Sequence, residues 1–311
     1  MKIFSAEDTA AALPYDRLIE GIRVAFAEGF QAPLRHHHTM PRTEEADAVL
    51  LLMPSWAGNG TYGGVKIVNV TPGNAARGLD AVTSSYILFD EVTGRHLALL
   101  DGGTLTSRRT AAASALAASY LAREDARSLL VVGAGRVGAE IPAAYKAIRP
   151  IERVTVWNPT ERRGAALVAS LQAEGWDARF EPDLPKAIAQ ADIISCATLS
   201  KAPLVTGDLL RPGQHLDLIG SFTPEMREAD DAAMQKGRVF IDTEAAAVES
   251  GDIRLPLASG ALDRASLATL YDLCGNKTQG RRSAEEITIF KGVGVAIEDL
   301  AAAIVAVRSA G

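Results

Sequence analysis

The first hundred residues change from a helical to an extended hydrophobic pattern. Apolar residues recur at helical spacing through residues 15–30, and Ser5 followed by Asp8 is typical of a helix start. Between Val49 and Leu100, short apolar runs alternate with turn-forming residues. Because no helical stretch separates these runs, they predict an antiparallel or mixed sheet. The predicted strands are 49–53, 64–68, 84–89 and 96–100.

From about residue 128, short apolar runs alternate with segments of helical spacing. This alternation predicts a parallel sheet covered by helices on both faces. The fold class is therefore predicted to be α/β, with a Rossmann-type doubly wound parallel sheet plus an α+β domain. An alanine-rich, buried helix at residues 110–122 is expected to join the two. The predicted strands are 129–132, 153–157, 192–196, 215–219 and 239–242, and the clearest helices are 160–173 and 184–191.

Composition and charge exclude several classes of function. Of the 311 residues 48% are hydrophobic and the formal net charge is −6, so no nucleic-acid partner is indicated. No apolar run approaches the roughly 18 residues that span a bilayer, and no signal peptide opens the sequence. We therefore expect a cytoplasmic protein without a membrane partner, in which Cys196 and Cys274 are reduced. His36–His38 are expected in a loop, and no spacing completes a metal site.

A glycine-rich turn is the first feature of the sequence that indicates a ligand-binding site. The apolar run 128–132 leads directly into Gly133, Gly135 and Gly138, and a helical stretch follows at 139–148. The first glycine permits a tight turn, the second lets the backbone approach a pyrophosphate, and the third lets helix and strand pack closely. The helix N-terminus then directs its N–H groups at the phosphates. This context predicts a dinucleotide site.

The end of the next strand bears on which dinucleotide binds. Asn158 lies 20 residues after Gly138, where an NAD-binding protein would carry a carboxylate for the ribose. A neutral Asn158 does not repel a 2′-phosphate, and Thr160, Arg162 and Arg163 follow at once. An arginine there can pair with a dianionic phosphate, although both arginines would also suit a solvated helix face. We expect NADP(H) to be favoured, with NAD(H) possible.

Three basic residues in the first half are candidates for binding an anion. Lys66 lies in an otherwise apolar strand, a pattern that an outward-facing lysine would fit equally well. Arg109 precedes the alanine-rich helix, and a cation beside a helix start is unfavourable for the helix dipole, which indicates a bound anion. Arg42 is unremarkable by itself.

The glycine-rich turn, the three basic residues and several further stretches of the sequence resemble the ornithine cyclodeaminase/mu-crystallin family. This resemblance extends over nearly the whole chain. Each match alone is modest, but their order and spacing identify the chain as a member. The family includes ornithine cyclodeaminases, an alanine dehydrogenase and imine reductases. The matching stretches are 40–42, 64–69, 90–94, 105–112, 132–138, 220–230 and 290–299.

The resemblance implies a homodimer and assigns roles to residues. A substrate and dimerisation domain would comprise 1–117 with 288–311, and a Rossmann domain 118–287. Arg42, Lys66 and Arg109 would hold the α-carboxylate of a small amino or imino acid, with Lys66 near the reacting centre. Phe222 and Val293 are the remaining substrate-binding candidates. Together with the residue pattern, the implied cofactor-binding set is Thr110, Gly133, Gly135, Arg136, Val137, Gly138, Asn158, Thr160, Arg162, Thr198 and Ser221.

One departure from the family pattern narrows the expected reaction. Ornithine cyclodeaminases carry an aspartate that serves the distal amine, and the alignment puts Phe222 at that position. Binding a charged amine there would leave a buried cation without its partner, at a cost of several kcal/mol. We therefore expect reduction of a cyclic or linear α-imino acid. The alternatives are an ornithine cyclodeaminase, an alanine dehydrogenase, and an NADPH-binding crystallin-like protein without turnover.

Overall fold

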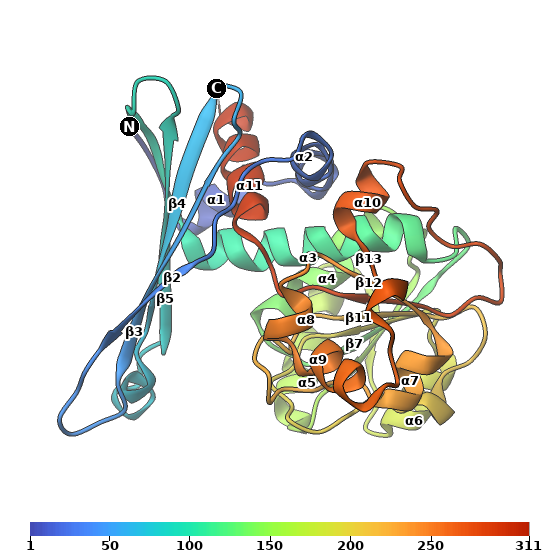
Figure 1. Ribbon diagram of the computed structural model, residues 1–311. Coiled ribbons are helices and arrows are strands. Elements are labelled where there is room, and N and C mark those ends of the chain that lie inside the picture. The colour runs from blue at the N-terminus through green and yellow to red at the C-terminus, as the bar shows by residue number, and fades with distance from the viewer. Residues whose placement is uncertain (311) are drawn as a thin grey trace. The chain divides into compact units, whose positions relative to one another are not determined.

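The computed structural model describes residues 1–310 of the chain (Figure 1). These residues form two compact units, one built from residues 1–109 with 295–310 and the other from residues 110–294. The division lies within the long helix α3 (Gly102–Leu121). No helix in the described part of the chain has both the length and the apolar character needed to cross a membrane.

The first unit is built on a six-stranded sheet in the order β1-β6-β5-β4-β3-β2. Strand β1 pairs with β6 in parallel and the other neighbours are antiparallel, so of the two predicted alternatives, an antiparallel or a mixed sheet, the sheet is mixed. All four predicted strands are present, and each is longer than predicted. The strands are β1 (Lys2–Phe4), β2 (His36–Met40), β3 (Ala48–Trp56), β4 (Tyr62–Val70), β5 (Val82–Asp90) and β6 (His96–Asp101).

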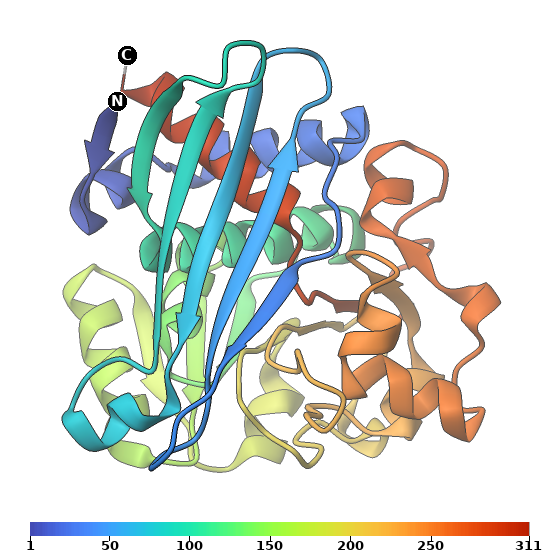
Figure 2. The ribbon, with the colours of Figure 1, turned by 60° about the vertical axis from the view of Figure 1, so that its left-hand side comes forward.

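Helices cover only one face of this sheet (Figure 2). The C-terminal helix α11 (Ala296–Ser309) packs on β3, β4 and β5, and α2 (Tyr15–Glu28) packs against α11. Their approach is close, since a Cβ added to Gly21 would lie 2.6 Å from a methyl group of Val305. Helix α1 (Ala6–Ala11) begins at the predicted position, where Ser5 and Asp8 form a reciprocal capping box. A 3₁₀ turn, η1 (Pro72–Arg77), links β4 and β5.

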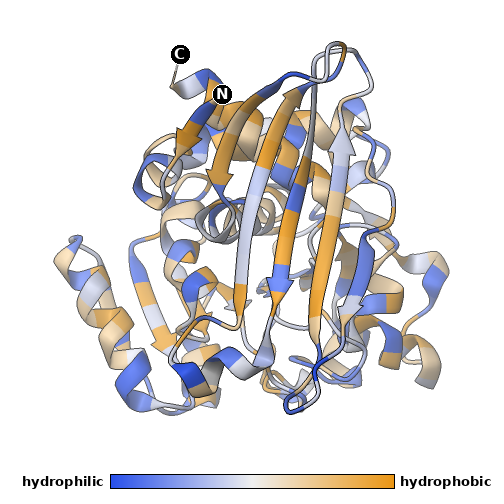
Figure 3. Ribbon diagram, turned by 90° about the vertical axis from the view of Figure 1, so that its left-hand side faces the viewer, coloured by the Kyte–Doolittle hydropathy of each residue, from blue (hydrophilic) through white to orange (hydrophobic). Residues whose placement is uncertain are grey.

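The register of the sheet separates a covered row from an open row. Phe4, Leu100, Tyr86, Lys66 and Met53 are cross-strand neighbours in turn, and all five are buried. Because side chains alternate along a strand, the adjacent row lies on the opposite face. That row is apolar; Ile3 is exposed and the other members are partly buried, and the row belongs to the face that Figure 3 presents. Its members are Ile3, Leu99, Ile87, Val65 and Pro54.

The second unit contains an eight-stranded, wholly parallel sheet in the order β13-β12-β14-β11-β10-β7-β8-β9. The order reverses between β7 and β10, which is the doubly wound arrangement predicted from the alternating pattern. The five predicted strands are all present. The strands are β7 (Ser128–Val132), β8 (Arg153–Trp157), β9 (Asp177–Phe180), β10 (Ile193–Cys196), β11 (His215–Leu218), β12 (Arg238–Ile241), β13 (Ala268–Thr269) and β14 (Thr288–Lys291).

The helices of the second unit connect these strands and enclose an apolar core that includes Leu130, Ile194 and Leu216. Both cysteines are free and buried. The helical elements are α4 (Arg136–Lys146), α5 (Glu161–Ala173), α6 (Leu184–Gln190), η2 (Gly207–Leu209), α7 (Asp231–Lys236), α8 (Ala246–Glu249), α9 (Gly251–Ser259), η3 (Arg264–Ser266) and α10 (Leu270–Cys274).

Three features differ from the sequence-based expectations. His36–His38 form strand β2 and not a loop, because their backbone pairs with Leu50–Leu52 of β3. Residues 288–291 were expected in the first domain, but they form β14 between β11 and β12, and the first unit resumes at residue 295. Helix α3 begins at Gly102, eight residues before the predicted stretch 110–122.

Candidate functional site

Lys66 faces the covered side of the first unit's sheet. It lies on β4 with 3% of its surface exposed, so the outward-facing alternative for this lysine is wrong. Its Nζ pairs with Oδ2 of Asp299 on α11 at 2.7 Å. Burial lowers the pKa of Lys66 from 10.5 to about 8; the carboxylate of Asp299 opposes this shift, and the charge of Arg109 adds to it. An ammonium group with this pKa can release its proton at mildly basic pH.

Arg109 shares the same carboxylate. Its Nε donates to Oδ1 of Asp299 at 3.0 Å, and its Nη1 donates to Oε2 of Glu298 at 2.5 Å. Arg109 is also buried. The positive charges of Lys66 and Arg109 and the negative charges of the two acids therefore compensate one another out of contact with solvent. Burial alone would lower the pKa of Arg109, but the carboxylates of Asp299 and Glu298 outweigh it and raise the pKa. The guanidinium stays charged at any accessible pH.

Arg109 does not lie beside a helix start, so the prediction made from the helix dipole is wrong. Because α3 begins at Gly102, Arg109 lies inside the helix. The anion that it holds in this structure is supplied by Glu298 and Asp299, two consecutive acids at the start of α11. Sequence reasoning missed both as functional residues. The available signal was a pair of acids within an otherwise apolar helical stretch, a position where a buried acid needs a cation.

Arg42 lies apart from this cluster. It follows β2, its side chain is 43% exposed, and its guanidinium lies 3.9 Å from the carboxylate of Glu45. Its backbone N–H donates to Asp47. The structure therefore brings together two of the three predicted carboxylate-binding residues, Lys66 and Arg109, and leaves Arg42 on the surface.

In the second unit, three glycines where β7 leads into α4 have different constraints: Gly133 and Gly135 lie in the turn and Gly138 in the first turn of α4. Gly133 has a φ of +110°, and a Cβ there would lie 2.6 Å from the carbonyl oxygen of Ala197. A Cβ on Gly138 would lie 2.1 Å from the carbonyl oxygen of Gly133, so helix and turn are in close contact. A Cβ on Gly135 would meet nothing within 4 Å. Packing thus explains Gly133 and Gly138, whereas Gly135 leaves open space beside the backbone.

That open space lies at the N-terminus of α4. Gly135 is the N-cap and provides no side-chain hydrogen bond, so the first N–H groups of the helix are left for a ligand. Arg136 and Val137 are the first residues of α4, and Arg136 is exposed. These features fit the pyrophosphate of a dinucleotide.

Asn158 holds the glycine turn from the end of β8. Its Oδ1 accepts from the backbone N–H of Ala134 at 3.1 Å, and its Nδ2 donates to the carbonyl oxygen of Thr160 at 2.9 Å. Thr160 is the N-cap of α5 without a side-chain cap, and Arg162 and Arg163 are exposed in the first turn of that helix. This edge of the sheet therefore presents N–H groups and two guanidinium groups.

The remaining predicted residues lie mostly at the carboxyl ends of strands. Thr198 follows β10 and is partly buried; Ser221 and Phe222 follow β11. Phe222 is 51% exposed, whereas the buried hydroxyl of Ser221 is bonded to Ser250 and to the carbonyl oxygen of Met226. Val293 follows β14, where its N–H donates to the buried carboxylate of Asp242 at 2.7 Å. Thr110, at the start of the second unit, is partly buried in α3.

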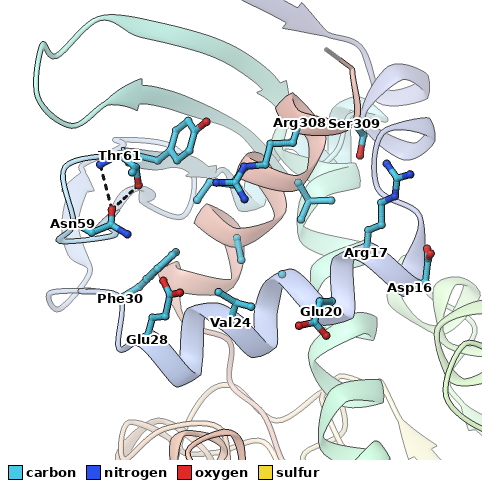
Figure 4. Close-up of a pocket in the computed structure, with 15 residues that line it drawn as sticks. Asp16, Arg17, Glu20, Val24, Glu28, Phe30, Asn59, Thr61, Arg308 and Ser309 are labelled. Atoms are coloured by element: carbon cyan, nitrogen blue, oxygen red, sulfur yellow. Dashed lines mark hydrogen bonds between the residues drawn. The ribbon is translucent and has the colours of Figure 1, made fainter.

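A cavity in the first unit lies outside the predicted site. The cavity, of about 570 Å³, lies in the first unit between α2, α11 and the β3–β4 turn (Figure 4). Its walls mix the acids Glu20 and Glu28 with Arg17 and Arg308, and none of the predicted site residues lines it. Across residues 1–310, no group of three His, Cys, Asp or Glu side chains is arranged to hold a metal ion.

Comparison with known proteins identifies the family. A model of the ornithine cyclodeaminase/mu-crystallin family matches residues 4–310. The chain belongs to this family. Among curated members, the Δ1-pyrroline-2-carboxylate reductase of Paracoccus denitrificans is 41% identical, and the alignment covers 89% of this chain and 90% of that protein.

Solved structures of similar fold match this chain over nearly their whole length. The Δ1-pyrroline-2-carboxylate reductase of Thermococcus litoralis, in complex with NADH and L-proline, has a TM-score of 0.92 and 31% identity. That match covers 100% of this chain and 97% of the other. An archaeal alanine dehydrogenase dimer with bound NAD has a TM-score of 0.88 and 29% identity, covering 100% and 96% of the two chains.

Proposed function

We propose that the chain is an NAD(P)H-dependent reductase of small α-imino acids, with Δ1-pyrroline-2-carboxylate as the first substrate to test. The observation that carries this proposal is the buried pair of Lys66 and Arg109, which offers a carboxylate ligand and a proton donor in one place. The glycine turn beside α4 offers the dinucleotide site. The 41% identical relative bears the name of this reductase, which supports the choice of substrate.

In the proposed reaction, Arg109 binds the substrate carboxylate through guanidinium N–H groups beyond those that hold Asp299 and Glu298. When bound, the reduced nicotinamide supplies a hydride to the carbon of the C=N bond. Lys66 delivers a proton to the imine nitrogen, so the C=N bond becomes a C–N single bond and the product is an amine. Asp299 holds the Lys66 ammonium in place before the transfer. We place Arg42 at the edge of the substrate site.

The proposed electron donor is NADPH in preference to NADH. No carboxylate stands at the end of β8, where Asn158 is committed to the glycine turn. The exposed Arg162 and Arg163 offer charge-assisted bonds to a 2′-phosphate at the N-terminus of α5. Replacing Arg162 with alanine is expected to raise the KM for NADPH and leave that for NADH unchanged. Equal use of both dinucleotides by the unaltered enzyme would contradict this preference.

We also propose that the chain forms a homodimer through the open face of the first unit's sheet. The row Ile87, Val65 and Leu99 is apolar and uncovered, and exposed apolar patches of this kind mark association surfaces. Light scattering should give a mass of twice 32.8 kDa. Ile87→Glu should reduce it to one chain, while Val92→Glu, at a residue that is 76% exposed in a loop, should leave the dimer intact.

The decisive assay follows the absorbance of NADH and NADPH at 340 nm. Δ1-Pyrroline-2-carboxylate, Δ1-piperideine-2-carboxylate, pyruvate with ammonia, and ornithine are the substrates to compare. We expect turnover of a cyclic imine and no ammonia release from ornithine, since Phe222 offers no carboxylate for a distal amine. Full activity of both Lys66→Ala and Arg109→Ala would refute the assignment. Tight dinucleotide binding without turnover of any substrate would favour a crystallin-like binding protein.

A further inference from the structure

A fully buried glutamate joins two turns of the second unit. Glu228 lies between β11 and α7 with no exposed surface. Its Oε1 accepts from the backbone N–H and the hydroxyl of Thr198 at 2.7 and 2.8 Å. Its Oε2 accepts from the backbone N–H of Gly220 at 2.7 Å. One carboxylate therefore ties the turn after β10 to the turn after β11.

These two turns are packed without spare room. A Cβ added to Gly220 would lie 1.9 Å from the carbonyl oxygen of Thr198 and 2.5 Å from Oε1 of Glu228. Only a glycine admits the carboxylate at this distance from both backbones. The contact is therefore specific to the combination of Gly220 and Glu228, and its geometry depends on both oxygens acting as acceptors.

Further buried groups bond the backbone of Glu228 and of the residue that follows it. Oδ1 of Asp252 accepts from the backbone N–H groups of Glu228 and Ala229 at 2.8 and 3.0 Å. Nζ of the fully buried Lys291 lies 3.7 Å from Oδ2 of Asp252 and supplies positive charge. Ser250 caps Asp252 and bonds the hydroxyl of Ser221, at 3.2 and 2.8 Å. The network thus extends from Thr198 to Ser221, the residue that follows Gly220.

The order of strands locates this network relative to a dinucleotide. In a doubly wound sheet, the ligand crosses the carboxyl ends at the point where the strand order reverses, here between β7 and β10. The glycine turn and Asn158 belong to the β7–β8 half, which receives the adenosine. The turns after β10 and β11 belong to the opposite half, where the nicotinamide of a bound dinucleotide would lie.

We propose that Glu228 is a positioning residue for the nicotinamide half of the cofactor, holding the Thr198 and Gly220 turns at a fixed separation. It does not touch the cofactor. Its effect passes through the two backbones that it bonds, so it governs the nicotinamide half and leaves the pyrophosphate and the adenosine to Gly135 and Asn158. This inference rests on the proposed use of a nicotinamide dinucleotide.

The test compares a dinucleotide with the fragment that lacks nicotinamide. Glu228→Gln replaces one oxygen by an NH₂ group, which cannot accept from a backbone N–H. Calorimetry should show that this variant binds the preferred dinucleotide, NADH or NADPH, at least about tenfold more weakly, in line with the loss of one charge-assisted bond. The matching fragment, ADP-ribose or its 2′-phosphate, should bind within about twofold of the unaltered protein.

Two further variants keep the outcome decisive. Glu225→Gln removes an exposed charge from the same segment and should bind both ligands normally. Thr198→Val removes one of the three bonds and keeps the carboxylate. If Glu228→Gln does not fold, this variant should show a smaller loss of affinity that is again confined to the dinucleotide.

Equal weakening of both ligands, or of neither, would overturn the proposal. If the unaltered protein binds the ADP-ribose fragment but neither dinucleotide gains affinity from its nicotinamide, the inference fails while the glycine-turn site stands. If the unaltered protein binds no dinucleotide, the proposed function itself fails.

Discussion

Lys66 shows what residue type and pattern can predict and what they cannot. A lysine inside an apolar strand marked a candidate, but the two orientations of a strand side chain were equally compatible with the sequence. Its partner Asp299 lies on α11, and the acids that hold Arg109 stand 189 and 190 positions further along the chain. No local pattern encodes a pairing over that distance. Arg42 is not part of this cluster: its side chain is 43% exposed and lies 3.9 Å from Glu45.

The lowered pKa of Lys66 predicts a pH limit for the proposed reduction. The amine can donate a proton only while it is protonated, which holds below about pH 8. We expect kcat/KM to fall about tenfold per pH unit above that value. Asp299→Asn removes a charge that raises this pKa, so the limit should move to lower pH. A rate profile that stays flat from pH 7 to pH 10 would exclude Lys66 as the donor.

Arg109 should also be required for stability, independently of catalysis. Arg109→Met leaves Glu298 and Asp299 buried without one of their cations, which is expected to lower the free energy of unfolding by about 3–5 kcal/mol. Adding Glu298→Gln to Arg109→Met removes one of the uncompensated charges. The double variant should therefore regain part of the lost free energy of unfolding. Urea unfolding at pH 7 measures both effects. Additive losses in the double variant would show that the pair is not coupled.

At the scale of elements, alternating apolar runs predicted the strands well where tertiary contacts follow the local pattern. They failed for His36–His38, because three polar residues form an edge strand solely through pairing with β3. They also failed for residues 288–291, because β14 enters the sheet between β11 and β12, strands that precede it by more than 45 residues. The glycine turn was predictable because its packing and the proposed dinucleotide site both require the same short segment.

The glycines of that turn provide a matched pair of variants. Gly135→Ala adds a methyl group that meets no protein atom within 4 Å and keeps an allowed φ of −92°, so folding should be unaffected. Dinucleotide affinity should fall at least about tenfold, because the methyl group occupies the space for the pyrophosphate. Gly138→Ala should instead lower the melting temperature, since its methyl group meets the carbonyl oxygen of Gly133. Calorimetric binding and thermal melts on both variants separate the two roles.

At the scale of the whole molecule, buried ionisable groups of the second unit make its stability depend on pH in opposing ways. Burial raises the pKa of Asp217 to about 6 and that of Glu228 to about 7, so these carboxylates cost stability as the pH rises through those values. Burial lowers the pKa of His215 to about 3, so this imidazole remains neutral in the folded chain. The dependence of the free energy of unfolding on pH is the sum of these contributions, and a variant of one residue separates its contribution from the others.

His215→Gln isolates the histidine contribution. Its Nδ1 lies 3.0 Å from the hydroxyl of Thr288, and a glutamine can keep that bond. Below about pH 6.5 the unfolded chain binds a proton at this histidine and the folded chain does not, so the unaltered protein loses about 1.4 kcal/mol per pH unit down to about pH 3. At pH 7 the variant should be the less stable form because its packing is imperfect. Between pH 7 and pH 5 the free energy of unfolding of the variant, relative to that of the unaltered protein, should rise by about 2 kcal/mol. All other titrating groups are shared by the two proteins. Urea unfolding of both proteins at the two pH values measures this change, and a constant difference would show that His215 takes up its proton in the folded state.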